Sequence, residues 1–97
     1  MTRHDIHKKI IEHYGIGLQL EKASEELREL DKEVWIYADK ENNRQAVLTE
    51  IADVLNCIEQ LKLMLDISDA EIEQEQNRKM QRTLNRMSEN IGQMEEE

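Results

Sequence analysis

Two pairs of acidic side chains have the residue types and the spacing of metal ligands. Glu26 and Glu29 stand three residues apart, and so do Glu50 and Asp53. On a helix, residues three apart are neighbours about 5–6 Å apart at Cβ, so each pair offers two carboxylates on one flank. Oxygen ligands suit Mg²⁺ or Mn²⁺, and Mg²⁺ commonly binds through carboxylates together with the phosphates of a substrate. The residues predict a divalent-metal site, provided that the two pairs converge.

Acidic residues are also common on solvated helix surfaces. The chain has 22 of them among 97 residues, so this spacing arises by chance, and either pair alone is more typical of a solvated face. Glu50 and Asp53 differ because they stand within the apolar segment TEIADVLN at residues 49–56. A charge that borders buried surface needs a partner, and this context favours the metal site.

Apolar periodicity places both pairs on long helices that can face each other. Apolar residues recur at gaps of three and four over residues 20–37, and again over residues 47–65. A polar break at residues 39–44 separates the two segments, so an antiparallel pair is expected. The first row comprises Leu20, Ala23, Leu27, Leu30, Val34 and Tyr37, and the second comprises Val47, Ile51, Val54, Ile58, Leu61 and Leu65.

A short helix is expected before this pair. Residues 6–13 are charge-rich, and Gly15 and Gly17 indicate a turn between this helix and the next. Segment 1–13 is expected to be mobile, and its histidines, at positions 4, 7 and 13, are interpreted as solvated.

A third long helix is expected after the pair. Ser68 has the position of an N-cap, with Glu71 as its capping-box partner. The helix over residues 69–91 is polar and is expected to pack as an outer layer, with a frayed tail at residues 92–97. The whole chain, residues 1–97, is interpreted as a single domain.

The composition favours an all-α protein that associates with itself. Proline and phenylalanine are absent, only three glycines occur, and 36% of the residues are charged. A chain of this length buries little apolar surface alone. We therefore expect an antiparallel helical bundle whose core is completed in a homo-oligomer, a dimer or a tetramer.

The charge and the hydropathy pattern exclude several partners. The net charge of −9 argues against a nucleic acid polymer, because such binding depends on Lys and Arg at the phosphates. No apolar run approaches the roughly 18 residues that span a bilayer, and the first residues lack a signal-peptide pattern. With one cysteine, Cys57, the chain fits a reducing compartment, so a cytoplasmic protein is expected.

The acidic motifs also resemble a known family. EELREL at residues 25–30, followed by EIADVL at residues 50–55, is similar to the paired E-x-x-E and E-x-x-D signature of the all-α nucleoside triphosphate pyrophosphohydrolases of MazG type. The likeness extends to YGIGLQL at residues 14–20 and EQLKL at residues 59–63. These runs are similar to those of short MazG-like proteins from phages and mobile elements.

The resemblance implies an enzyme that hydrolyses a nucleoside triphosphate between its α- and β-phosphates. Glu26, Glu29, Glu50 and Asp53 would hold Mg²⁺, or Mn²⁺, at the catalytic centre. A phosphoribosyl-ATP substrate is a less attractive variant of this hypothesis. The alternative from another class is a non-catalytic helical adaptor whose acidic residues only solubilise it.

Several further residues are candidates for substrate binding. Lys79, Arg82 and Arg86 lie on one helix face and match a run in similar phage-type sequences. They either bind the triphosphate or pair with acids of a neighbouring helix. Asn56, Trp35 and Gln19 are candidate contacts to base, sugar or phosphate, with surface exposure or packing as the alternative.

If Lys79 and Arg82 bind the triphosphate, substituting either by Met raises the KM for the nucleotide. The expected change is about tenfold for each, because a charge-assisted hydrogen bond contributes about 1.5–3 kcal/mol. Steady-state kinetics measure it. Unchanged kinetics in both variants would leave only the pairing role.

Overall fold

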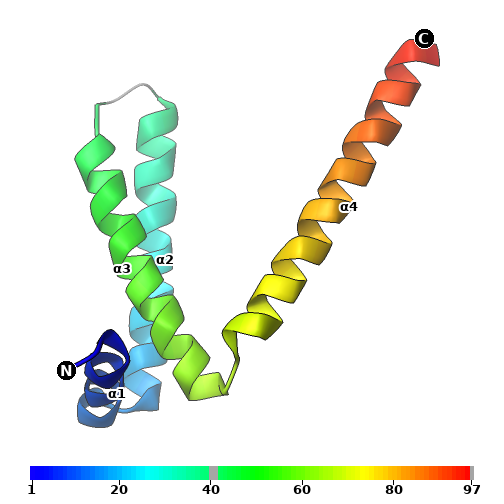
Figure 1. The fold of residues 1–97 in the computed structure, drawn as a ribbon. Helices are drawn as coiled ribbons and strands as arrows, with labels where there is room; N and C mark the ends of the chain where they lie inside the picture. The colour runs from blue at the N-terminus through cyan, green and yellow to red at the C-terminus, as the bar shows by residue number, and fades with distance from the viewer. Residues whose placement is uncertain (40–41, 97) are drawn as a thin grey trace. The chain divides into compact units, whose positions relative to one another are not determined.

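The computed structural model confirms an all-α chain. It describes the backbone of residues 1–39 and 42–96 and the side chains of this part as far as residue 89. The helices are α1 (Arg3–Tyr14), α2 (Ile16–Ala38), α3 (Arg44–Leu65) and α4 (Asp69–Glu96), shown in Figure 1. The chain divides into two compact units, Met1–Asp66 and Ile67–Glu97. None of the described helices is long and apolar enough to span a membrane.

Helices α2 and α3 form an antiparallel pair, as the two apolar rows predict (Figure 1). The turn between them includes part of the predicted break at residues 39–44, of which residues 40 and 41 lie outside the described part. Asn43 ties the turn to α2, because its side-chain amide donates to the backbone oxygen of Glu33 at 2.8 Å and to its carboxylate at 2.9 Å. These contacts stabilise the antiparallel arrangement at the end of the pair.

The apolar core of the first unit is thin. The apolar residues that are buried in the described part are Ala23 on α2 and Val54 and Cys57 on α3. Cys57 is a free cysteine and packs here as a small apolar side chain. Much of each predicted apolar row is exposed, because two helices alone can cover only a narrow strip of each other's surface. Exposed members of these rows are Leu20, Leu27, Val34, Tyr37, Ile51, Ile58 and Leu65.

Helix α1 begins and ends at clear signals. The side chain of Thr2 accepts a hydrogen bond from the backbone N–H of Asp5, whose carboxylate accepts from the backbone N–H of Thr2, a capping box. The helix ends at Gly15, which has φ +88° and ψ 159°. This conformation is essentially restricted to glycine. The predicted turn is thus a single residue, and Gly17 lies inside α2.

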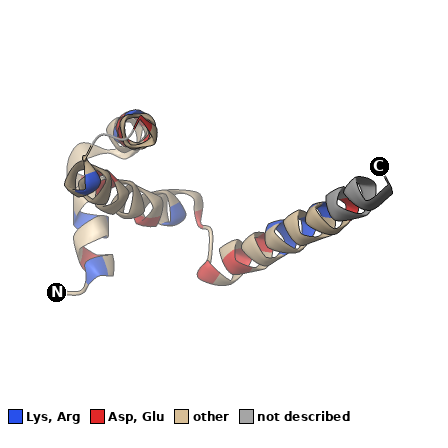
Figure 2. Ribbon diagram, turned by 90° about the horizontal axis from the view of Figure 1, so that it is seen from above, with Lys and Arg blue, Asp and Glu red and all other residues tan. Residues whose placement is uncertain are grey.

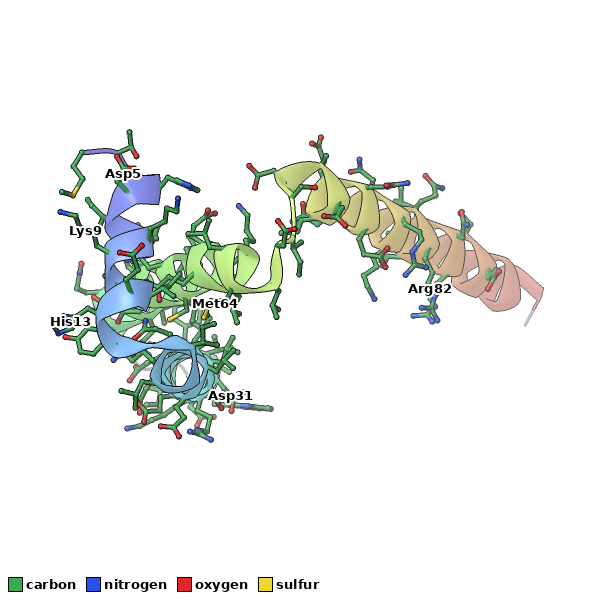
Figure 3. The ribbon with its side chains drawn as sticks, turned by 90° about the horizontal axis from the view of Figure 1, so that it is seen from below. Asp5, Lys9, His13, Asp31, Met64 and Arg82 are labelled. Carbon is green, nitrogen blue, oxygen red and sulfur yellow. The ribbon has the colours of Figure 1, made fainter. Side chains whose placement is uncertain are left out.

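Helix α4 begins at the predicted cap. The backbone N–H of Ser68 donates to the Glu71 carboxylate at 2.8 Å, and the backbone N–H of Glu71 donates to the Ser68 hydroxyl at 3.1 Å. Acidic residues occupy the first turns of α4 and basic residues its middle, among them Arg82 (Figures 2 and 3). The backbone stays helical to Glu96, and the side chains of the predicted tail at residues 92–97 lie outside the described residues.

The two glycines before and inside α2 make a matched pair for mutation. Gly15→Ala should lower the free energy of unfolding by about 1–3 kcal/mol, because a Cβ is strained at this backbone conformation. Gly17→Ala should raise it by about 0.5–1 kcal/mol, because Gly17 is helical and no described atom lies within 4 Å of an added Cβ. Urea denaturation followed by circular dichroism measures both, and equal effects would contradict the assigned helix boundary.

Candidate metal centre and pocket

Three carboxylates from two helices meet between α2 and α3. Glu26 on α2 and Glu50 and Asp53 on α3 each offer one oxygen, and these three oxygens lie within 4.8 Å of one another. The antiparallel pair thus brings together three of the four predicted metal ligands. Glu29 is exposed and lies outside this group, which we call the carboxylate cluster.

The cluster is partly withdrawn from solvent. Glu26 is only 8% exposed, because it follows the buried Ala23 by about one turn on the face that α2 presents to α3. The Oε2 atom of Glu50 is buried, and it has no hydrogen-bond partner within the part of the chain that the structure describes. A buried acceptor without a partner lowers the free energy of unfolding by about 1–3 kcal/mol, and by more when the acceptor is charged. This oxygen fits a cation, which would supply the missing contact.

Electrostatics within the cluster are unfavourable to the ionised acids on α3. Desolvation raises the pKa of Glu50, and the charges of Glu26, Asp53 and, more weakly, Glu29 raise it further. Desolvation also raises the pKa of Asp53, followed by the charge of Glu26. Carboxylates this close repel one another unless positive charge lies between them.

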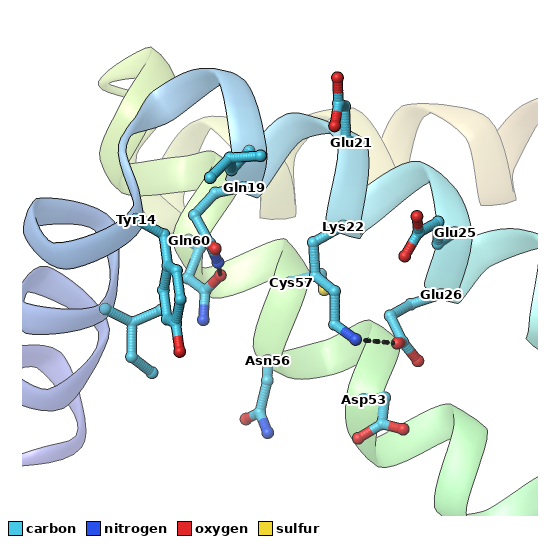
Figure 4. A pocket seen from close by; sticks show the side chains of 12 residues that line it. Tyr14, Gln19, Glu21, Lys22, Glu25, Glu26, Asp53, Asn56, Cys57 and Gln60 are labelled. Carbon is cyan, nitrogen blue, oxygen red and sulfur yellow. Dashed lines mark hydrogen bonds and ion pairs between the residues drawn. The ribbon is translucent and has the colours of Figure 1, made fainter.

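Lys22 supplies one positive charge at the edge of the cluster. Its Nζ atom lies 2.8 Å from Oε1 of Glu26, as the dashed line in Figure 4 marks. The hydrogen bond from Lys22 is the main cause of the lowered pKa of Glu26. The same bond raises the pKa of Lys22, so both partners stay charged near neutral pH.

Two members of the cluster, Glu26 and Asp53, line a pocket of about 550 Å³ on the first unit (Figure 4). This volume is within the range of about 300–1,000 Å³ that is usual for small-molecule sites. Two predicted substrate contacts, Gln19 and Asn56, line it. The lining as a whole combines acids, amides, one lysine, one aromatic ring, two aliphatic side chains and one cysteine: Ile10, Tyr14, Leu18, Gln19, Glu21, Lys22, Glu25, Glu26, Asp53, Asn56, Cys57 and Gln60.

A buried polar network includes two residues of the pocket lining, Gln19 and Gln60, and extends from them to His7. The amide nitrogen of Gln19 donates to Oε1 of Gln60 at 2.6 Å, and the amide of Gln60 lies 3.2 Å from Nδ1 of His7. All three side chains are less than 9% exposed. The interpretation of His7 as a solvated histidine is therefore wrong: α1 packs its side chain against α3.

Gln60 is not among the site residues predicted from the sequence, although its spacing from other residues of α3 indicates that it belongs to the same helix face. Cys57 follows Asp53 by four residues and Gln60 follows Cys57 by three, so all three lie on one face of α3. A polar residue on that face must be paired when the face is buried. His7 gave no comparable signal, because its partner lies on another helix.

The remaining predicted contacts lie outside this pocket's lining. Trp35 on α2 is 67% exposed and does not contribute to the core of the described part. Lys79, Arg82 and Arg86 are exposed on α4, in the second unit. Their proposed contact with a triphosphate stays a prediction.

Comparison of this chain with known proteins found no relative. No family model, no curated protein and no solved structure matches this chain. Any functional interpretation therefore depends on the residues of the site itself.

The carboxylate cluster should make the metal-free protein less stable as the pH rises. The raised pKa values of Glu50 and Asp53 mean that ionising them opposes folding, and this penalty is relieved as the pH falls through their folded-state pKa values. The lowered pKa of Glu26 acts in the opposite sense, since its contribution is lost in acid. Glu50→Gln should therefore raise the urea midpoint at about pH 8 and have a smaller effect at about pH 4.

Glu59→Gln is the matched control on the same helix, because Glu59 is exposed and pairs with Lys62 at 2.9 Å. It should give no such pH-dependent gain. A Glu50→Gln gain that is equal at both pH values would show that charge repulsion is not its source.

Proposed function

We propose that this chain is a divalent-metal-dependent nucleoside triphosphate pyrophosphohydrolase. The observation that carries the proposal is the convergence of Glu26, Glu50 and Asp53, two of which, Glu26 and Asp53, line a pocket large enough for a nucleotide. The unpartnered, buried oxygen of Glu50 supports a cation in the cluster. The acidic motifs that resemble the MazG-type enzymes contribute these same residues.

The donor set fits Mg²⁺ or Mn²⁺. All three clustered donors are carboxylate oxygens, which hard divalent cations prefer over nitrogen or sulfur. Glu29, close enough for its charge to act on Glu50, would be a further acidic residue beside the ion. A bound ion would offset charge on the phosphates and lower the pKa of water. In the absence of an ion, the same carboxylates face one another at an electrostatic cost.

The chain's own residues would bind and orient the nucleotide. The phosphates would lie at the carboxylate end of the pocket, beside Lys22, while Gln19 and Asn56 would offer amide hydrogen bonds to the base or sugar. Attack of a water molecule at the α-phosphorus breaks the bond to the bridging oxygen of the β-phosphate. The products are a nucleoside monophosphate and pyrophosphate, a reaction that suits sanitising a nucleotide pool in the cytoplasm.

A homo-oligomer is part of this proposal. The apolar residues left exposed on α2 and α3 include Leu27, Val34, Leu55 and Leu65, each more than 48% exposed. Rows of such residues on two adjacent helices are unusual on a monomer surface and are typical of an interface. A second copy, in a dimer or a tetramer, would cover them and thicken the core.

The same exposed residues favour a second candidate function, a non-catalytic helical adaptor. In that case the acidic cluster would serve only solubility, and the exposed faces would bind a different protein. The two candidates differ in whether the cluster binds a metal and turns over a nucleotide.

The enzyme hypothesis predicts pyrophosphate release that depends on Mg²⁺ and on the cluster. Glu50→Gln and Asp53→Asn should each lower kcat by at least about 100-fold, because each removes a charge that would hold the ion. A coupled pyrophosphate assay over canonical and damaged nucleoside triphosphates measures activity, and circular dichroism checks the fold of each variant.

Glu59→Gln serves again as the control on α3 and should retain full activity. The adaptor function would be favoured if no triphosphate in the panel released pyrophosphate in the presence of Mg²⁺ or Mn²⁺.

A further inference from the structure

Lys22 has a contact that helix stability does not explain. It precedes Glu26 by one turn on α2, and its ammonium lies 2.8 Å from the Glu26 carboxylate. In isolated helices the reverse order, Glu before Lys, is the better orientation for such a pair. The Lys22 side chain is also 55% exposed, so taken as an isolated pair on one helix this contact would add little to helix stability.

The surroundings of Lys22 give the contact another role. Among the described residues that line the pocket, Lys22 is the only cation, and Glu21, Glu25, Glu26 and Asp53 line the same pocket. Figure 4 shows its side chain extending across the pocket wall toward Glu26, with Asp53 on the neighbouring helix. Its ammonium therefore sits where positive charge is needed to hold converging carboxylates together.

We propose that Lys22 is a built-in counter-ion of the carboxylate cluster, which holds Glu26 while no divalent cation is bound and opposes the binding of that cation. The inference rests on the proposed metal site. Lysine suits this role, because its ammonium is a point charge on a flexible stem and can leave without moving the backbone. The half-exposed side chain has room to turn toward solvent.

The competition follows from charge. Without movement, a divalent ion on the same carboxylate would lie roughly 5 Å from the ammonium, a repulsion of about 1–2 kcal/mol even at the dielectric constant of water. This sets an upper limit of about a tenfold loss of affinity for the ion, because turning the ammonium toward solvent relieves part of the repulsion. Lys22 thus sets the metal affinity of the site and limits repulsion in the metal-free protein.

The test is Mn²⁺ binding to the metal-free protein, measured by isothermal titration calorimetry, together with the thermal midpoint without metal. Lys22→Met should bind Mn²⁺ more tightly, by up to about tenfold, and unfold at a lower temperature without metal. Lys32→Met is the matched control, because Lys32 is exposed on the same helix and lies outside the pocket lining. It should change neither quantity.

The outcomes separate this inference from the proposed function. If the wild-type protein binds no Mn²⁺, both are overturned. If the wild type binds Mn²⁺ and Lys22→Met binds it equally well or more weakly, the counter-ion role is overturned and the metal site stands. A purely structural role would lower the thermal midpoint without tightening Mn²⁺ binding.

Discussion

The repulsion among three converging carboxylates is the constraint on which the rest of the first unit depends. Glu26, Glu50 and Asp53 meet where the antiparallel pair would otherwise bury apolar surface, in a chain of net charge −9. In the part of the chain that the structure describes, the buried apolar side chains are few and small, so the core contributes little to offset the repulsion. Lys22 offsets part of this repulsion by its contact with one carboxylate, and the raised pKa values of the other two favour their neutral forms, which carry no repelling charge.

Buried hydrogen bonds help to hold the helices together, as an apolar core does in larger domains. Gln60 lies between His7 and Gln19, so its side chain links α3 to α1 on one side and to α2 on the other. Buried amides are selective partners, since a misplaced donor or acceptor is left unpaired at a cost of about 1–3 kcal/mol. The network therefore fixes how α1 docks, and with it the pocket wall that α1 contributes through Ile10 and Tyr14.

Much of the fold was predictable from the sequence, because helices depend on local signals. The apolar rows, the polar break before Arg44 and the Ser68 cap correctly place the long helices. The site was predictable only in part. Spacing of three residues puts Glu26 and Glu29 on one flank, but the rotation of α2 against α3 decides which of them meets the partner helix. That rotation depends on packing between helices, and so does the burial of His7.

The carboxylate cluster and the exposed apolar rows lie on the same two helices, so covering the rows in an oligomer would also affect the stability of the cluster. One side of α2 and α3 carries the cluster, whose charges push the helices apart, while other sides carry apolar residues such as Leu27 and Leu55. Covering those residues with a second copy would add apolar burial, about 25 cal/mol per Å², to the same helix pair. An oligomer could then tolerate a cluster of ionised carboxylates that a thin monomeric core holds less firmly. In the proposed oligomer, self-association and metal binding would stabilise one structure, because each would offset the repulsion at the α2–α3 interface by a different means.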